Sequence, residues 1–260
     1  YAGSDSIEIT LDSTAPTVTL SDTDSDNLLA ASDTVTITAS FSEAMTATPT
    51  ISISGTSISN QVMTKIIGGS GLGSHTLLGA DIDGEAVNNS SGYSVSLSSD
   101  GSRVAIGAPS NDENGSNSGH VRIYDYNGSA WVQVGADIDG EATNDNSGYS
   151  VSLSSDGSRV AIGATFNDAN GADSGHVRIY DYNGSAWVQV GADIDGEAAD
   201  DKSGDSVSLS SDGSRVAIGA YNNDGGGSNS GHVRIYDYNG SAWVQVGADI
   251  DGEAADDKSG

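Results

Sequence analysis

Acidic residues provide most of the side chains in this sequence that could do chemistry. In the segment Asp22-Thr23-Asp24-Ser25-Asp26-Asn27 every second residue is an aspartate, and Asp33 follows, so that carboxylates occupy positions 1, 3, 5 and 12 of one loop. Calcium takes six to eight hard oxygen ligands, and this spacing suits it. The alternative is a solvated acidic turn between two strands. Ca²⁺ is therefore the cofactor that the sequence predicts, at this loop first.

A second set of acids recurs at a fixed interval and is another candidate calcium site. In an extended segment, alternate side chains share one side, and like charges there repel one another unless a cation or water intervenes. The alternative, which we favour, is a solubilising loop that keeps strand edges from pairing with other chains. The members are Asp81, Asp83, Glu85; Asp137, Asp139, Glu141; and Asp193, Asp195, Glu197.

Nucleophilic catalysis is not indicated. His120, His176 and His232 occur once in each copy of a repeated unit, behind a glycine. A catalytic group is normally unique, so a structural hydrogen-bonding role is expected for these histidines. Trp131 and its copies are expected to pack between strands, and Asp112 with its copies is expected to form an Asx-turn. We predict that the protein is not an enzyme.

Composition narrows the choice of partners and compartment. The 260 residues include 37 Asp and Glu against 9 Lys and Arg, a formal charge of −28, and no cysteine. Nucleic acid and anionic membranes are polyanions and would be repelled. No apolar run is long enough to span a membrane. We expect a bacterial protein that is secreted or on the cell surface, and we expect this chain to be an internal piece of a longer one.

The elements that must position these side chains are set by a repeat. Gly-Ala-Asp-Ile-Asp-Gly-Glu begins at 79, 135, 191 and 247, which gives units 79–134, 135–190, 191–246 and a partial unit 247–260, with a period of 56 residues. In the first unit, strands are predicted at 93–97, 103–108, 120–126 and 131–134.

The turn sequences and the apolar residues on both faces of the predicted sheet then indicate the architecture. Asp-Gly and Asn-Gly join the strands in two tight antiparallel hairpins per unit. Both faces of the predicted sheet carry apolar residues, so each sheet must be covered on both sides. This pattern predicts an all-β chain containing a partial β-propeller of four-stranded antiparallel blades. A β-solenoid is the alternative. Because propellers need at least about four blades, further repeats of the same chain are expected to close the ring.

The unit also resembles a known repeat. Ser91-Gly92-Tyr93-Ser94, Ala105-Ile106-Gly107-Ala108-Pro109 and Gly119-His120-Val121-Arg122-Ile123-Tyr124 are similar to the FG-GAP repeat of integrin α-subunit propellers and their bacterial relatives. The resemblance covers residues 79–260. It implies ligand-binding loops on one side of the propeller. The calcium loop of that family is reduced here to Ser99-Asp100-Gly101, and we do not transfer it.

The first 78 residues have a different composition, rich in Ser, Thr and Asp. Strands are predicted at 17–20, 34–41 and 50–54. Asp12-Ser13-Thr14-Ala15-Pro16 and Phe41-Ser42-Glu43-Ala44-Met45 resemble bacterial Ig-like domains. This resemblance implies that residues 1–13 close a preceding domain and that 14–67 are an incomplete Ig-like β-sandwich segment, with a Gly-rich joint at 68–78.

The ten differences between the second and third units lie in two windows, 143–149 and 165–173, which pair with 199–205 and 221–229. Both windows fall in the long connections, which leave an up-and-down blade on the same side. A rigid scaffold that displays variable loops on one surface is typical of binding proteins; relaxed drift in exposed loops is the alternative. We predict an adhesin-like protein that binds a protein or glycan there. An accessory domain of a secreted enzyme and a structural spacer are the other two hypotheses. The ligand-binding residues predicted in these windows are Asn144, Asn146, Tyr149, Phe166, Asn167, Asp168, Asn170, Asp173, Tyr221, Asn222 and Asp224.

Overall fold

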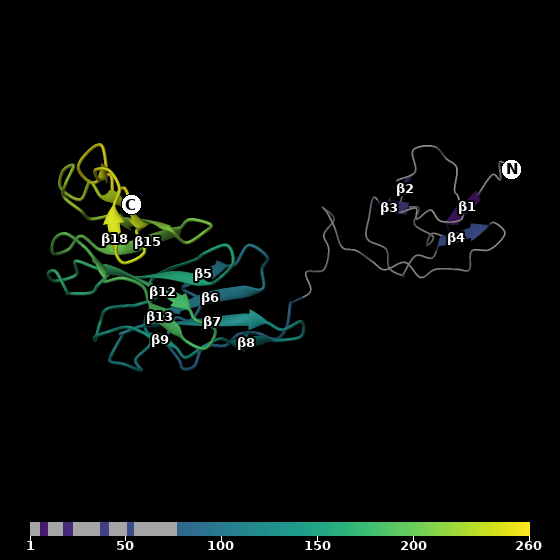
Figure 1. The fold of residues 1–260 in the computed structure, drawn as a ribbon, viewed down its shortest axis with the longest axis horizontal. Coiled ribbons are helices and arrows are strands. Elements are labelled where there is room, and N and C mark those ends of the chain that lie inside the picture. Colours follow the sequence, from purple (N-terminus) through teal and green to yellow (C-terminus); the bar gives the residue numbers. More distant parts are fainter. Residues whose placement is uncertain (1–5, 10–17, 23–36, 42–50, 55–76) are drawn as a thin grey trace. The chain divides into compact units, whose positions relative to one another are not determined.

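The computed structural model describes residues 77–260 and four short strands before them, 6–9, 18–22, 37–41 and 51–54 (Figure 1). The chain divides into two compact units, 1–76 and 77–260. In the described residues every regular element is a strand. The all-β prediction is therefore confirmed for this part of the chain.

In the first unit, the described strands form two antiparallel pairs. β1 (Ser6–Ile9) pairs with β4 (Ile51–Ser54), and β2 (Val18–Asp22) pairs with β3 (Ile37–Phe41). β1 thus shares a sheet with a strand of its own unit. That residues 1–13 close a preceding domain stays a prediction. The Ig-like segment at 14–67 and the joint at 68–78 lie mostly outside the described residues and stay predictions.

The second unit contains three copies of one sheet, and the repeat prediction is confirmed. Figure 1 shows them in chain order, from teal through green to yellow. The strands are β5 (Ser94–Leu97), β6 (Arg103–Ala108), β7 (His120–Tyr126), β8 (Trp131–Gln133) and β9 (Ile138–Asp139); β10 (Ser150–Leu153), β11 (Arg159–Ala164), β12 (His176–Tyr182), β13 (Trp187–Gln189) and β14 (Ile194–Asp195); β15 (Ser203–Leu209), β16 (Arg215–Ala220), β17 (His232–Tyr238), β18 (Trp243–Gln245) and β19 (Ile250–Asp251).

Each sheet is a four-stranded antiparallel meander, β5-β6-β7-β8 in the first copy. Its two hairpins are tight, as predicted: the Gly101 N–H donates to the Ser98 oxygen at 2.9 Å and the Asn127 N–H to the Ala130 oxygen at 3.0 Å. These sheets of a 56-residue repeat are the blades of a partial β-propeller.

The outer edge of each blade holds one more strand than predicted. β9 pairs with the start of β7, through His120↔Asp139 and Val121↔Ile138, while β8 pairs with the end of β7. β8 and β9 therefore follow one another along the same edge and together form an interrupted outer strand. The segment from 135 to 148, predicted as a connection between blades, is partly sheet.

The core lies between successive blades, face against face. Ala105, Val121 and Ile123 of the first blade share one buried cluster with Val151 and Ile162 of the second. The equivalent face of the second blade packs in the same way on the third. The two apolar faces that the sequence predicts are thus both used, because each blade covers its neighbour.

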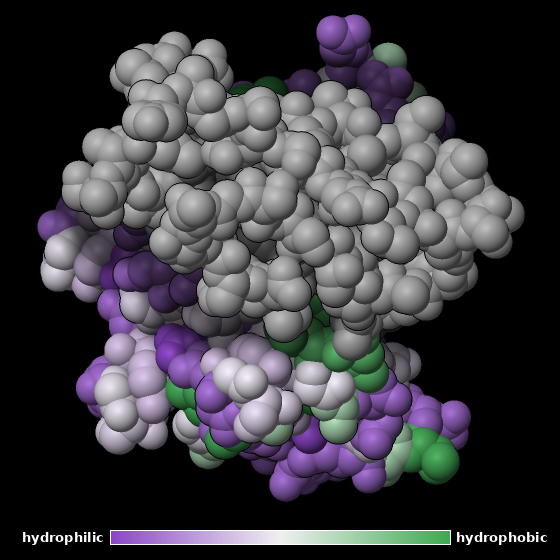
Figure 2. All heavy atoms as spheres, turned by 90° about the vertical axis from the view of Figure 1, so that its right-hand side faces the viewer, coloured by the Kyte–Doolittle hydropathy of each residue, from purple (hydrophilic) through white to green (hydrophobic). Residues whose placement is uncertain are grey.

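Two blade faces lack a covering blade within the described residues. Val95 and Leu97 on β5 are 63% and 59% exposed, whereas their copies Val151 and Leu153 on β10 are 9% and 7% exposed. At the other end, Ile250 is 55% exposed. Elsewhere the visible repeat surface in Figure 2 is mostly hydrophilic, with small hydrophobic groups. The first blade therefore exposes the face that the other two blades bury against the preceding blade. The third blade exposes the opposite face, which the other two bury against the following blade.

Candidate functional site

The variable windows of neighbouring blades lie at the same end of the blades and contact one another. The Asn144 N–H donates to the Ser116 oxygen at 2.8 Å, and the Asn146 N–H donates to the Asn117 oxygen at 3.0 Å. One repeat later, the Lys202 Nζ lies 2.6 Å from the Asp173 Oδ2. We call the surface formed by residues 143–149, 165–173, 199–205 and 221–229, together with the equivalent residues 87–93 and 109–117 of the first unit, the loop face.

Several predicted ligand-binding residues build this loop rather than project from it. The Asp168 Oδ1 accepts a hydrogen bond from the Asp173 N–H at 2.8 Å, which closes a wider loop, whereas the Asx-turn predicted for this aspartate is made by its neighbour Asn167, whose Oδ1 accepts from the Ala169 N–H at 2.8 Å. The Asn167 side chain is buried and donates to the Asp145 Oδ2 at 3.0 Å. The Asn170 Nδ2 donates to the Gly196 oxygen at 2.8 Å. These polar side chains fix the shape of the surface.

Four more of the predicted ligand-binding residues also help to fix the backbone of this surface. The Asp224 Oδ1 closes the equivalent loop by accepting from the Asn229 N–H at 2.7 Å. Asn144 and Asn146 adopt left-handed backbone conformations, with φ of 67° and 56°, which asparagine tolerates better than most residues. The Asn222 N–H donates to the Asp201 oxygen at 3.4 Å.

Aromatic rings gather on the loop face, and three of them form a continuous group. The ring centroids of Tyr93 and Tyr149 lie 4.8 Å apart, and those of Tyr149 and Phe166 lie 6.1 Å apart, edge to face. The Lys202 Nζ lies 4.2 Å from the centre of the Phe166 ring. We call Tyr93, Tyr149 and Phe166 the aromatic patch. Tyr93 is 55% exposed and the other two are half-buried, so the patch is open to solvent.

The electrostatics of the patch follow from its packing. A hydrogen bond with Tyr93, followed by burial, raises the pKa of Tyr149. Burial also raises the pKa of Asp205, which occupies the position of Tyr149 in the next unit. Burial and then the charge of Asp205 raise the pKa of Tyr221. The surface thus combines neutral hydroxyls, apolar rings and a few charges of both signs.

The acids of one repeated segment do not lie together as a single group in this structure, while the solubilising role favoured for them stays a prediction. Residues of one Asp-Ile-Asp-Gly-Glu segment separate into two clusters, and each cluster gains a histidine. Asp137 lies 3.5 Å from the His120 Nδ1, whereas Glu141 of the same segment lies 3.9 Å from the His176 Nδ1. We call these groups the histidine clusters: Glu85, His120 and Asp137; Glu141, His176 and Asp193; Glu197, His232 and Asp249. Glu113 also borders the first.

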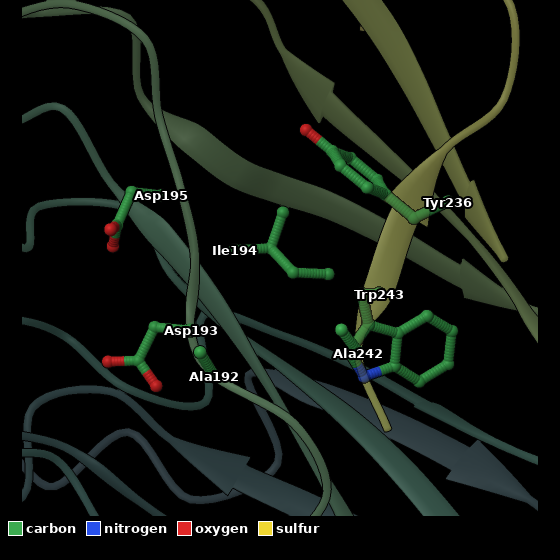
Figure 3. A pocket seen from close by; sticks show the side chains of 7 residues that line it. All are labelled: Ala192, Asp193, Ile194, Asp195, Tyr236, Ala242 and Trp243. Atoms are coloured by element: carbon green, nitrogen blue, oxygen red, sulfur yellow. The ribbon is translucent and has the colours of Figure 1, made fainter. Parts of the chain in front are cut away.

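The sheet explains this separation. Ile194 is buried in the core between the second and third blades, so the residues on either side of it turn away from that core. Figure 3 shows the hollow beside it, in which Asp193 and Asp195 lie on one side and Ile194 points toward Tyr236 on the other. Asp81, Asp83 and Asp195 are exposed, and Asp139 is paired with His120 on the strand ladder.

The structural hydrogen-bonding role predicted for the histidines is not seen at their Nδ1 atoms. All three imidazoles are about 1% exposed or less, and none of the three Nδ1 atoms has a hydrogen-bond partner in the described structure. Burial, then the positive charge of Arg178, lowers the pKa of His176 to about 4. Burial raises the pKa of Glu141 and of Asp139. A neutral imidazole thus faces two carboxylates.

The tryptophans pack as predicted, and an arginine of each repeat joins the same packing. The Arg178 guanidinium lies 5.6 Å from the centre of the Tyr180 ring, and its Nη2 donates to the Asp139 oxygen of the neighbouring blade at 2.7 Å. The Trp187 ring lies 5.2 Å from that of Tyr182 and packs on the core between the blades. These residues belong to blade packing.

The reduced loop of the first hairpin is a turn in this structure. The Asp100 carboxylate accepts hydrogen bonds from the Ser98 hydroxyl at 2.7 Å and from the Ser102 N–H at 2.9 Å. The Ser102 N–H, then the Ser98 hydroxyl, lowers the pKa of Asp100 to about 2. The predicted calcium loop at Asp24, Asp26 and Asp33 lies outside the described residues, apart from Asp22 at the end of β2, and stays a prediction.

Comparison with known proteins agrees with this geometry. Residues 137–180, most of the second blade, match the FG-GAP repeat family. This match and the repeated four-stranded sheets indicate a propeller-like repeat domain. No curated protein matches the chain.

Two solved structures show a partial likeness. Hydrazine synthase of Kuenenia stuttgartiensis has a TM-score of 0.39 and 12% identity, over 72% of this chain and 42% of that chain. A candidate 6-phosphogluconolactonase of Bacteroides uniformis has a TM-score of 0.40 and 14% identity, over 60% of this chain and 40% of that chain. The chain thus spans less than half the length of either. Among the described residues, no helix has the length and apolar character needed to cross a membrane.

Proposed function

We propose that the repeats are a non-catalytic binding domain of a secreted or cell-surface, adhesin-like protein, and that they bind a protein or glycan through the loop face. The observation that carries this proposal is the aromatic patch. Its three rings come from two different repeats and lie in or beside the windows where the repeats differ. Exposed rings of this kind stack on sugar rings and on apolar side chains of a partner.

The rest of the loop face supports this role. Its backbone is fixed by the Asx-turns and by contacts between neighbouring connections, so a ligand would meet a preformed surface and little ordering cost would oppose binding. The scaffold beneath is copied nearly unchanged between the second and third repeats, whereas the rings of Tyr149 and Phe166 are replaced in the third by Asp205 and Asn222. Further repeats of the same chain are the natural cover for the exposed Val95 and Leu97, which are copies of residues that a blade buries.

The test uses residues that the protein itself accepts at these positions. The third unit has Asp205 where the second has Tyr149, and Asn222 where the second has Phe166. We would probe glycan and protein arrays with the full chain and with Tyr149→Asp and Phe166→Asn. Each aromatic contact is worth about 0.5–1.5 kcal/mol, so each variant should weaken binding by about tenfold at the upper end of that range.

Ser185→Ala is the matched control, because Ser185 is exposed in the hairpin at the opposite end of the same blade. It should bind like the unaltered chain. Equal binding by all variants would contradict the aromatic patch as the binding surface. A chain that captures nothing on either array would support a structural spacer instead.

A further inference from the structure

We propose that each histidine cluster binds a divalent transition-metal ion of the Zn²⁺ type, which links two neighbouring blades. The ligands in the second cluster are the His176 Nδ1, the Glu141 Oε2 and the Asp193 Oδ2. The same three residue types recur in the first and third clusters. This proposal concerns other residues than the loop face and does not depend on the ligand bound there.

The unpartnered imidazole nitrogen is the observation that points to a cation. A buried polar atom without a hydrogen bond costs free energy, and here the same atom is left without a partner in all three blades. Each of these nitrogen atoms faces two carboxylates, and a carboxylate offers it no hydrogen-bond donor. An ion that accepts the Nδ1 lone pair and balances both negative charges would satisfy these three ligands, although the Nε2 of His176 also has no hydrogen-bond partner among the described residues.

The distances fit shared coordination better than direct contact. The His176 Nδ1 lies 3.9 Å from both the Glu141 Oε2 and the Asp193 Oδ2, which is too far for a hydrogen bond. In the first cluster the corresponding distances from the His120 Nδ1 are 3.8 Å and 3.5 Å. Two ligands on one tetrahedral Zn²⁺, each at about 2.0–2.2 Å, lie about 3.3–3.6 Å apart. A small closure of the carboxylates would complete the site.

The donor set selects the class of metal. One imidazole with two carboxylates suits zinc and related transition metals, whereas calcium and magnesium prefer an all-oxygen shell. The imidazole is held rigidly by burial, and the carboxylates reach it from a more exposed side: the side chains of Glu141 and Asp193 are 45% and 29% exposed. An ion could enter from that side and keep a water ligand.

A neighbouring arginine orients one ligand. The Arg178 Nη1 lies 3.5 Å from the Glu141 Oε1, so the guanidinium holds one carboxylate oxygen while the other, Oε2, faces the imidazole. Outer-shell contacts of this kind commonly fix metal ligands in proteins. The same pair recurs as Arg122 with Glu85 and as Arg234 with Glu197.

The cluster also joins two blades. His176 and Asp193 belong to the second sheet and its outer edge, whereas Glu141 directly follows β9 of the first. An ion held by all three would cross-link the sheets at the loop end. Because it binds the folded array and not the unfolded chain, it should raise the melting temperature.

The test titrates Zn²⁺, and Co²⁺ as a coloured substitute, into the metal-free full chain in the presence of excess Ca²⁺, which occupies unspecific acidic positions. We expect up to three ions per chain, one for each cluster, and a higher melting temperature. We also expect Co²⁺ to absorb visible light as it does when its coordination has low symmetry. The variant Glu85→Gln/Glu141→Gln/Glu197→Gln keeps the shape of exposed side chains and should lower the affinity at least about tenfold.

The control Asp81→Asn/Asp200→Asn/Asp256→Asn removes as many charges from exposed residues outside the clusters and should bind like the unaltered chain. A second variant, His120→Gln/His176→Gln/His232→Gln, should abolish the Co²⁺ absorption. The proposal is overturned by an unaltered chain that binds no Zn²⁺ in Ca²⁺, or by glutamine and control variants that lose affinity equally. The latter result would mean unspecific attraction to an acidic surface.

Discussion

The indole Nε1 of Trp187 donates a 2.8 Å hydrogen bond to the backbone oxygen of Val134, the last residue of the preceding repeat. Trp243 makes the same bond to Val190, and Trp131 makes it to Leu78. Each tryptophan therefore ties the outer strand of its own blade to the chain that enters it from the blade before. For Trp187 and Trp243 the acceptor is the end of the preceding repeat, so these two bonds join successive blades.

Replacing Trp187 should show how much this tie contributes. Trp187→Phe keeps most of the apolar surface and loses the hydrogen bond, so the free energy of unfolding should fall by about 1 kcal/mol. Trp187→Ala also loses the packing and should cost about 3–5 kcal/mol. Denaturant unfolding measures both. Val188→Thr, at a half-exposed position of the same strand, should change stability by less than about 0.5 kcal/mol; a Trp187→Ala variant as stable as this control would contradict the packing role.

Leu97 and Leu153 give a matched pair for the stacking of blades. They occupy the same position of the repeat and share the flanking sequence, yet Leu97 is 59% and Leu153 7% exposed. Leu153→Ala should therefore cost about 2–5 kcal/mol, the usual loss for a buried leucine, and Leu97→Ala about 0.5 kcal/mol or less. Equal losses in denaturant unfolding would show that a covering surface buries Leu97 as well.

The sequence predicted the blades well because their signal is local. The segment 103–108 alternates apolar residues directly after a tight turn, and β6 has those bounds. β9 was missed because two residues are too short to show alternation, and because β8 and β9 reach the same neighbour through a break in register.

The sites were harder to predict than the strands. The acids of one segment were grouped because they are adjacent in sequence, but the strand pleat and the packing of two blades send Asp137 and Glu141 to different histidines. One histidine per repeat was the available signal, and we interpreted it as structural. The contact between Tyr93 and Tyr149 joins equivalent positions of two repeats, and no spacing within one repeat reveals it.

Gly163 tests how closely the blades approach. A Cβ at this position would overlap the carbonyl oxygen of Gly204 and the hydroxyl of Ser150. The hydroxyl can rotate away, but the carbonyl oxygen belongs to the backbone of β15 and cannot move without displacing that strand. Gly163→Ala should therefore cost about 1–3 kcal/mol in denaturant unfolding, the range for overpacking. Gly101→Asn is the control: Gly101 has open space around it and a φ of 71°, which asparagine tolerates. A Gly163→Ala variant no less stable than Gly101→Asn would contradict this approach.

The last prediction concerns pH and the buried His176. Its pKa is lowered from 6.5 to about 4 by burial and by Arg178, whereas the charges of Asp193 and Asp145 act in the opposite direction. Between these two pH values the unfolded chain binds a proton that the folded chain does not. The free energy of unfolding should therefore decrease as the pH falls from 6.5 toward 4, and the full contribution is present above 6.5.

Nearby carboxyl groups also contribute to the pH dependence of stability, so the contribution of His176 must be measured as a difference between the unaltered chain and a variant. Burial raises the pKa of Asp139, Glu141 and Asp195, so the folded chain binds protons at these groups more readily than the unfolded chain, and they oppose the loss. We would compare urea unfolding of the full chain and of His176→Gln at pH 7, 6 and 5, with a chelator to remove metal ions. Because glutamine does not titrate, the unaltered chain should lose more stability than the variant between pH 7 and 5. Parallel losses would mean that His176 takes up its proton in the folded state as easily as in the unfolded chain, which its burial and the adjacent guanidinium oppose.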